Sequence, residues 1–306
     1  MRSADASGGT WFPRWFWPSF AAPATLWLLA FFVVPFYVIL AVAFGGQDPI
    51  FLTAVPVYNP LHWDFGAFSD TVRSLFTNGE IIGHAFINTI WYVAAATILC
   101  LVIGYPVAYF IARHAGRWKP AFLIAFLAPF WISYMMRMFA WVNLLQADGY
   151  VNRALSAIGF IDHPVQWLTG RASTVILGLV YGYIPFMILP LYATLDRISG
   201  FTLEAARDLG AGQVATFLRV TLPLSRQAIL AGCVIVTLPM FGDYFTQTLL
   251  SASPRTAMLG NIIVSSLGSS LVKTGASLVV ILMLLLIAPM LYYLRSTARA
   301  LELAER

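Results

Sequence analysis

The sequence predicts an all-α polytopic membrane protein with six transmembrane helices, and composition and apolar patterning carry this prediction. The 306 residues are 60% hydrophobic and only 10% charged, whereas soluble domains carry about 25% charged residues. The mean hydropathy is +0.79, and the apolar residues gather in runs long enough to cross a bilayer. Because a helix satisfies its own backbone in lipid, the spans are expected to be helical.

Six apolar runs provide the expected spans, which cover residues 23–44, 83–111, 120–145, 173–195, 228–250 and 275–294. Pro239 and Gly242 predict a break in the fifth span, because proline removes a backbone donor and glycine weakens a helix. Between the spans, apolar residues at helical spacing predict two short surface helices near residues 65–76 and 151–158.

The charge distribution predicts the topology. Twelve of the 18 Lys and Arg residues fall in segments that this arrangement places in the cytoplasm, and five fall outside. Such a bias favours both termini in the cytoplasm. We therefore expect an interfacial N-terminal segment 1–22, a transmembrane domain 23–295 with a cytoplasmic loop 200–226, and a cytoplasmic tail 296–306. The basic residues are dispersed over loops, which argues against a nucleic-acid partner.

The loop 200–226 lies between two long apolar runs and carries five charged residues, Glu204, Arg207, Asp208, Arg219 and Arg226. Thr202 is expected to cap a first short helix with Glu204 in its first turn, where a carboxylate suits the positive helix end. Gly210 and Gly212 permit a sharp turn. A second short helix with Phe217 follows, and Pro223 is expected to end it.

Two interpretations of this loop stay open on pattern alone. Leu203, Ala206 and Gly210 recur at helical spacing and give the first helix a small apolar face. Such a helix followed by glycine and an aromatic residue can dock into a groove of a partner. An amphipathic helix that lies on the bilayer surface has a similar pattern.

The loop resembles the cytoplasmic loop of binding-protein-dependent ABC importer permeases, although Arg226 and Gln227 stand where the family usually has Pro-Gly. The resemblance implies a type I ABC importer permease fold. It also implies a coupling helix that sits in a cleft of a separate ATPase subunit. The residues that match or flank this motif are Glu204, Ala205, Ala206, Asp208, Gly210, Ala211, Phe217 and Pro223.

The sequence offers no catalytic, metal or cofactor motif. It contains no Gly-Lys pair, so a phosphate-binding loop of the G-x-x-x-x-G-K type is absent and ATP hydrolysis is expected from a separate subunit. The four histidines have no ligand spacing. An intramembrane enzyme therefore has no support. An ion-coupled secondary transporter usually carries several buried carboxylates in its spans. This sequence has one acidic residue in a span, Asp243, which weakens that interpretation.

Two charged residues lie inside expected spans, Arg137 and Asp243, at similar depth toward the outer side. They could form a structural ion pair. Alternatively, Asp243 lines the pathway and contacts a cationic substrate, with Tyr244 and Trp141 offering ring faces to the cation. Trp131, Tyr134 and Trp141 have the spacing of one helix face or of an interfacial aromatic belt.

A second resemblance concerns the third, fourth and fifth spans. The run 129–134 with Arg137 and Trp141, the run 183–190, and Gly242-Asp243-Tyr244 are similar to spermidine/putrescine-type permeases. A departure follows, because Ser251 and Ala252 stand where that branch usually has two glycines.

This resemblance implies import of a small cationic amine, spermidine or putrescine, across the inner membrane. An opine, an amino-acid-like compound or another small organic solute is the alternative cargo. The implied partners are two ABC ATPase subunits, a similar but different second permease, and an extracytoplasmic substrate-binding protein.

Overall fold

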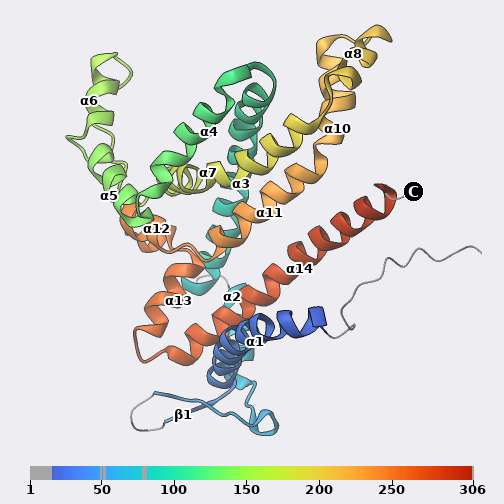
Figure 1. The fold of residues 1–306 in the computed structure, drawn as a ribbon. Coiled ribbons are helices and arrows are strands. Elements are labelled where there is room, and N and C mark those ends of the chain that lie inside the picture. The colour runs from blue at the N-terminus through green and yellow to red at the C-terminus, as the bar shows by residue number, and fades with distance from the viewer. Residues whose placement is uncertain (1–15, 49, 51–52, 78–80, 305–306) are drawn as a thin grey trace, which may run out of the picture.

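The computed structural model describes residues 16–48, 50, 53–77 and 81–304, and helices dominate them (Figure 1). The predictions for residues 1–15 lie outside this part of the chain. Helix α1 covers Phe16–Ala43 and includes Pro23 and Pro35, so the first span begins earlier than predicted. At the other end, α14 continues the last span as one helix, Val272–Ala304, through most of the expected tail.

Four helices in the described part of the chain are long and apolar enough to cross a membrane, namely α1, α3 (Ile81–His114), α7 (Ala172–Arg197) and α14. Two bent helix pairs also pass this test when each pair is taken together. If each pair is one span, the described residues provide up to six spans. The all-α prediction is confirmed.

The third span, predicted as one helix over 120–145, is broken. It consists of α4 (Lys119–Leu127), a 3₁₀ turn (Ala128–Trp131) and α5 (Tyr134–Leu145), which leads to α6 (Tyr150–Ala157). The two halves meet at an angle of 90°. The break falls at Ile132, which is extended, and at Ser133, shortly after Pro129, which cannot donate to the preceding turn.

The fifth span is bent at its start and broken near its end. The short helices α9 (Gln213–Thr216) and α10 (Leu222–Leu224) flank a π-helical turn (Phe217–Thr221), and a bend of 61° at Ser225 leads into α11 (Arg226–Phe241). The predicted break after Pro239 is confirmed, because α12 (Phe245–Leu250) begins only beyond Tyr244. With 16 residues, α11 is about 24 Å long and does not cross the ~30 Å hydrocarbon core alone.

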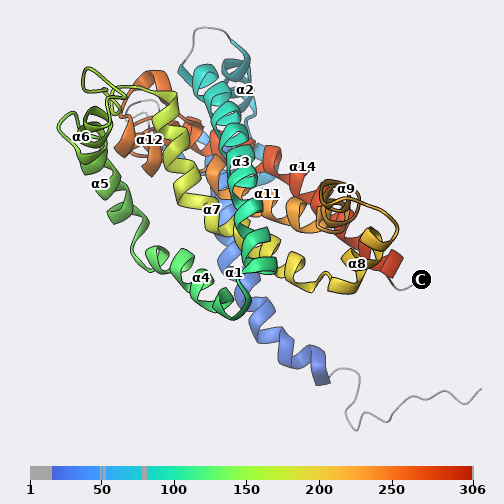
Figure 2. The same cartoon turned by 90° about the horizontal axis from the view of Figure 1, so that it is seen from above.

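The central core is built by α3, α7 and α11, whose buried side chains form one cluster that includes Ala96, Leu179 and Val236. A second cluster joins the end of α1 to α14, with Phe44 and Val280 among its members. The view from above places α5 and α6 on the opposite side of the bundle from α8 (Gly200–Asp208) and α9 (Figure 2).

Short elements cover one end of the bundle. The strands β1 (Gly46–Gln47) and β2 (Ala54–Val55) form an antiparallel hairpin. The helices predicted near 65–76 and 151–158 are confirmed as α2 (Gly66–Phe76) and α6. Helix α13 (Leu259–Leu267) was not predicted, because a helix this short is stabilised by packing, here against α14 and α3, rather than by its own sequence.

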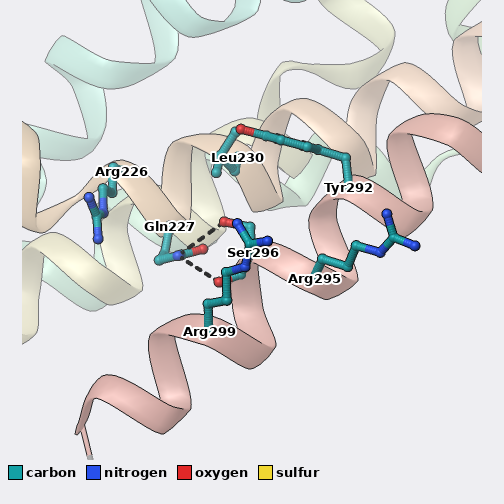
Figure 3. Close-up of a pocket in the computed structure, with 7 residues that line it drawn as sticks. All are labelled: Arg226, Gln227, Leu230, Tyr292, Arg295, Ser296 and Arg299. Atoms are coloured by element: carbon teal, nitrogen blue, oxygen red, sulfur yellow. Dashed lines mark hydrogen bonds between the residues drawn. The ribbon is translucent and has the colours of Figure 1, made fainter.

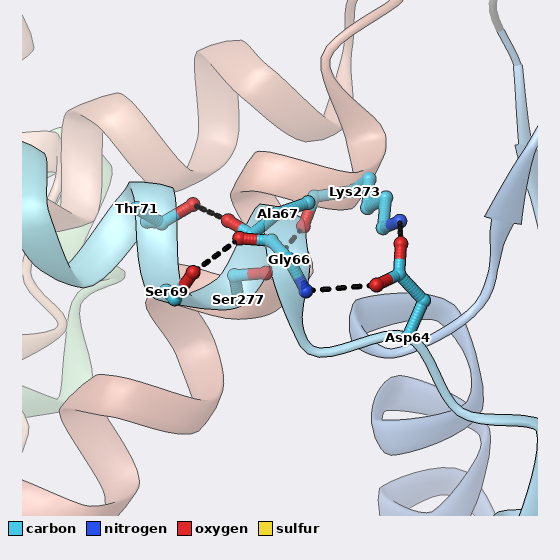
Figure 4. A network of polar contacts seen from close by, with 7 residues as sticks. All are labelled: Asp64, Gly66, Ala67, Ser69, Thr71, Lys273 and Ser277. Carbon is cyan, nitrogen blue, oxygen red and sulfur yellow. Dashed lines mark hydrogen bonds and ion pairs between the residues drawn. The ribbon is translucent and has the colours of Figure 1, made fainter.

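Asp64 contacts both the first residue of α2 and a residue at the start of α14 (Figure 4). Its Oδ1 accepts from Gly66 N at 2.9 Å and its Oδ2 lies 3.6 Å from Lys273 Nζ. The Gly66 N–H, and next the charge of Lys273, lower the pKa of this carboxyl group below its ordinary value. The side chain is exposed, so the ion pair itself adds little stability.

We expect cysteine labelling to establish the orientation of the chain. A cysteine at Asp162 should react with a membrane-impermeant thiol reagent in intact cells, because the charge bias places residues 147–169 outside. A cysteine at Asp208, an exposed position in α8, should react only after the membrane is opened. The opposite pattern would overturn the topology.

Candidate transport site and ATPase-coupling loop

Asp243 lies at the break between α11 and α12 and is 6% exposed. Its Oδ2 accepts hydrogen bonds from Tyr134 Oη at 2.8 Å, Tyr183 Oη at 3.0 Å and Thr246 Oγ1 at 2.8 Å. Its Oδ1 accepts from Thr246 N at 2.9 Å, in the first turn of α12. The break therefore places a buried carboxylate among donors from α5, α7 and α12.

A glycine gives Tyr134 its position. A Cβ atom on Gly182 of α7 would lie 2.7 Å from Cε2 and 2.9 Å from Oη of Tyr134. Any larger residue at 182 would displace the ring from the carboxylate. Gly182 and Tyr183 are neighbours on α7, so one turn of this helix both admits the first tyrosine and supplies the second.

Arg137 does not pair with Asp243, and the predicted ion pair is wrong for this structure. The ion pairs in the described part of the chain join Lys119 to Asp196 and Lys273 to Asp64. The guanidinium of Arg137 instead lies 4.0 Å from the ring centroid of Phe130 and 5.3 Å from that of Tyr134. Tyr134 thus contacts both charged residues, its ring facing Arg137 and its hydroxyl bonded to Asp243. Nε and Nη1 of Arg137 are buried without a hydrogen-bond partner.

The other expected pathway residues are less closely gathered. Trp141 packs edge-on against Tyr181, with ring centroids 5.2 Å apart, and Tyr244 packs on Phe245. Trp131 is 81% exposed on the 3₁₀ turn. Sequence reasoning did not assign Tyr183 to the site, although it is part of the run 183–190. Because the two tyrosines and the aspartate lie on different spans, their spacing in the sequence does not indicate that they meet.

An open pocket of about 580 Å³ is lined by Tyr244, the residue after Asp243, whereas Asp243, Tyr134 and Tyr183 are not among its lining residues. Tyr244 and Thr248 line it from α12 and its start, and Asn261 lines it from α13. Nδ2 of Asn261 donates to Tyr244 O at 2.9 Å and to Thr248 Oγ1 at 2.8 Å. The amide holds α13 against the break and so gives the cavity one polar wall.

The loop 200–226 forms two helical segments around a glycine turn, at the opposite end of the bundle from the β1–β2 hairpin (Figure 1). Ser199, and not Thr202, caps α8, because Ser199 Oγ accepts from Thr202 N at 3.2 Å. Glu204 consequently lies in the second turn of α8. Gly210 has φ +86°, a conformation that only glycine adopts easily.

Two further predictions for this loop need correction. Pro223 does not end the second segment at its own position, since the helical run Gln213–Leu224 continues one residue past it, and the bend follows at Ser225. Phe217 packs on its own chain, edge-on to Tyr105 and Tyr109 at 5.6 and 5.7 Å. Phe217 therefore holds the loop against α3, and this face of its ring is not available for contact with another subunit.

The outer surface of the loop is exposed and partly apolar. Phe201, Leu209 and Val214 are 82%, 90% and 72% exposed. Around them lie several residues of the predicted coupling set that are also exposed, namely Glu204, Ala205, Asp208, Gly210 and Pro223, whereas Ala206 and Ala211 are half-buried. Large apolar side chains at such exposure are typical of a surface that another protein covers.

Broken spans around a buried carboxylate, together with an exposed helical loop, define a multi-pass membrane transport protein. Comparison with known families identifies it further. Residues 104–301 match the family described as "Binding-protein-dependent transport system inner membrane component". The chain belongs to this family.

Several curated relatives share the sequence pattern. The spermidine/putrescine transport system permease protein PotB of Haemophilus influenzae is 34% identical over 241 residues, which cover 78% of this chain and 79% of that protein. PotB of Escherichia coli K12 is 39% identical over 168 residues, 55% of this chain and 60% of the relative. The inner membrane ABC transporter permease protein YdcU of the same organism is 34% identical over 211 residues, which cover 65% of this chain and 66% of that protein.

The fold has a solved counterpart. A chain of a bacterial alginate ABC transporter in complex with its alginate-bound periplasmic protein superposes with a TM-score of 0.70 and 18% identity, over 94% of this chain and 95% of that chain. The chain is thus the multi-pass inner-membrane permease subunit of an ABC importer. A separate ATPase and a substrate-binding protein are its partners, and ATP hydrolysis belongs to the former.

Proposed function

We propose that the chain carries a small cationic amine of the spermidine/putrescine type. Its relatives in Haemophilus influenzae and Escherichia coli are spermidine/putrescine transport system permeases. The observation that carries the proposal to this chain is the cluster around Asp243, a buried carboxylate that tyrosine rings and hydroxyls enclose. A carboxylate with aromatic neighbours is a chemical match for a protonated amine.

The mechanism follows from the donors around the carboxylate. Three hydroxyl donors and one amide donor form hydrogen bonds to the carboxylate of Asp243. An ammonium group in the pathway replaces the hydroxyl of Tyr134 or Tyr183 and makes a stronger, charge-assisted hydrogen bond. The two rings then remain beside the cation. In this proposal Trp141, Tyr244 and Trp131 offer further ring faces to the cation along its path.

We propose that α8 transmits the movement of the ATPase. Its exposed residues Phe201, Glu204 and Leu209 dock in a cleft of the ATPase subunit, and Gly210 sets the direction in which α8 leaves the bundle. Phe217 ties this loop to α3, so a displacement of α8 moves the central helices. Two ATPase subunits, one for each permease of the pair, rock the two halves between inward-open and outward-open states.

A second, similar but different permease completes the pathway in this proposal. Trp131 and Ile132 are exposed beside the break of the third span, and in this proposal the second permease covers this apolar surface. A second permease related by an approximate two-fold axis would supply the opposite wall.

Uptake measurements test the cargo. Cells that lack their own polyamine import and express this chain with its partner subunits should accumulate labelled spermidine or putrescine. An excess of unlabelled polyamine should compete, while an opine or a neutral amino acid should not. Titration calorimetry of the cognate binding protein with the same compounds provides an independent check. Binding and uptake of an opine with no response to polyamines would replace the proposed cargo by the alternative.

A further inference from the structure

Three arginines line a groove between the first turn of α11 and the last turns of α14, with Arg299 beside Gln227 and Ser296, and Arg226 and Arg295 toward its two ends (Figure 3). The groove has a volume of about 440 Å³. Arg226 and Gln227 line it from α11, and Arg295, Ser296 and Arg299 line it from α14 (Figure 3). Among the described residues that line it, none is acidic, so the positive charge is not neutralised within the groove.

Gln227 joins the two helices, and one of its acceptors is buried without a hydrogen-bond partner. Its Nε2 donates to the carbonyl oxygen and to Oγ of Ser296, both at 3.3 Å. Its Oε1 is buried and has no hydrogen-bond partner. Because buried polar atoms are nearly always satisfied, this oxygen indicates a missing donor. The groove therefore offers cations for an anion, and its wall holds a buried acceptor that lacks a donor.

On its apolar side, the groove borders exposed hydrophobic residues of α14. Leu230 and Tyr292 line it together with the charged residues, and Tyr292 is 63% exposed. Leu291 and Leu294, on the neighbouring turns of α14, are 43% and 51% exposed. At this end of α14 the apolar span passes into a basic segment. A ligand that fits the groove therefore has an anionic headgroup and an apolar tail.

We propose that this groove binds an anionic phospholipid of the cytoplasmic leaflet whose headgroup carries a hydroxyl, as phosphatidylglycerol does. The phosphodiester lies among the arginines, since guanidinium groups match phosphate oxygens geometrically. A headgroup hydroxyl donates to Oε1 of Gln227, and the acyl chains lie along Leu230 and Tyr292. Basic pockets between spans on the cytoplasmic side recognise lipid headgroups in this way.

The position of the site gives the lipid a consequence for transport. Arg226 is the first residue of α11 and follows the bend at Ser225, where the coupling loop ends. A lipid that joins α11 to α14 holds the base of this loop against the last span. The assignment to the cytoplasmic leaflet rests on the proposed topology, whereas the lipid preference can be measured without any transport.

Native mass spectrometry of the full chain with its partner subunits tests the site. After equilibration with equal amounts of phosphatidylglycerol and phosphatidylcholine, the wild type should retain the anionic lipid preferentially. The double variant Arg295→Gln/Arg299→Gln should lose this retention on the order of ten-fold, because each basic residue near an anionic surface contributes to the attraction. Arg295→Lys/Arg299→Lys should keep most of it. Arg117→Gln, which removes a basic residue of a different loop, serves as the matched control and should leave retention unchanged.

A second comparison tests Gln227. The wild type should retain phosphatidylglycerol over phosphatidylmethanol, which has the same charge and no headgroup hydroxyl, and Gln227→Leu should lose this difference while it still retains both. Equal retention of phosphatidylglycerol by the wild type and by Arg295→Gln/Arg299→Gln would overturn the proposal. Displacement of the lipid by millimolar glycerol phosphate would identify a soluble anion as the ligand and overturn it as well.

Discussion

We expect Gly210→Val to reduce uptake about 100-fold, near the upper end of the coupling free energies that link distant sites, while the permease still inserts into the membrane. Gly210 has φ +86°, and a left-handed residue with a branched side chain is strained by roughly 1–2 kcal/mol. The segment relieves this strain by turning α8, which moves Glu204 and Leu209 away from the ATPase cleft. Uptake and co-purification of the ATPase subunit measure the effect.

Two variants separate this effect from general damage to the loop. Gly210→Asn should retain most uptake, because asparagine tolerates a positive φ. Gly200→Ala changes the first residue of α8, where an added Cβ has no atom within 4 Å, and should behave as the wild type. Normal uptake and normal ATPase binding in Gly210→Val would rule out the proposed role of α8 in coupling.

The second large effect is expected at Asp243. Replacement by asparagine keeps an oxygen that can accept from Tyr134 and Tyr183, so the fold should persist. Import should nevertheless fall roughly 100-fold, since a hydrogen bond to a charged group contributes up to about 3 kcal/mol. ATP hydrolysis stimulated by the loaded binding protein should continue. Labelled uptake and ATPase activity of the reconstituted complex measure the two responses.

The control and the counter-test come from the same chain. Asp162→Asn removes an exposed acid of an outer loop and should leave import unchanged. The double variant Arg137→Gln/Asp243→Asn removes both buried charges. If Asp243 only balanced Arg137, this variant would recover import. Because the two groups do not pair in the structure, we expect no recovery, and restored uptake would exclude a role of Asp243 toward the substrate.

Local rules in the sequence were sufficient for the long elements. The apolar runs around α3, α7 and α14 predict spans, because in lipid a helix is the simplest way for a single segment to satisfy its backbone. Pro239 and Gly242 predicted the break at which Asp243 lies. The glycine turn at Gly210 was also predicted, since its conformation depends on the residue itself.

The site needed contacts between distant segments. Tyr134, Tyr183 and Asp243 lie on three different helices, and their meeting depends on the break after Pro129 and on the space that Gly182 leaves. Equal depth in the membrane suggested that Arg137 pairs with Asp243, but depth says nothing of the direction in which a side chain points around its helix. The tyrosine hydroxyls reach the carboxylate, and the guanidinium lies on Phe130.

The sequence by itself determined the class of this protein, its long apolar helices and the glycine turn of the loop 200–226, because these follow from hydropathy and from residues whose backbone preferences are local. Only the tertiary structure decided which groups surround Asp243, that Phe217 packs inward on Tyr105, and that Gln227 and the arginines of α14 form one groove. These relations depend on helix rotation and close packing between segments far apart in the chain, which no single stretch of sequence specifies.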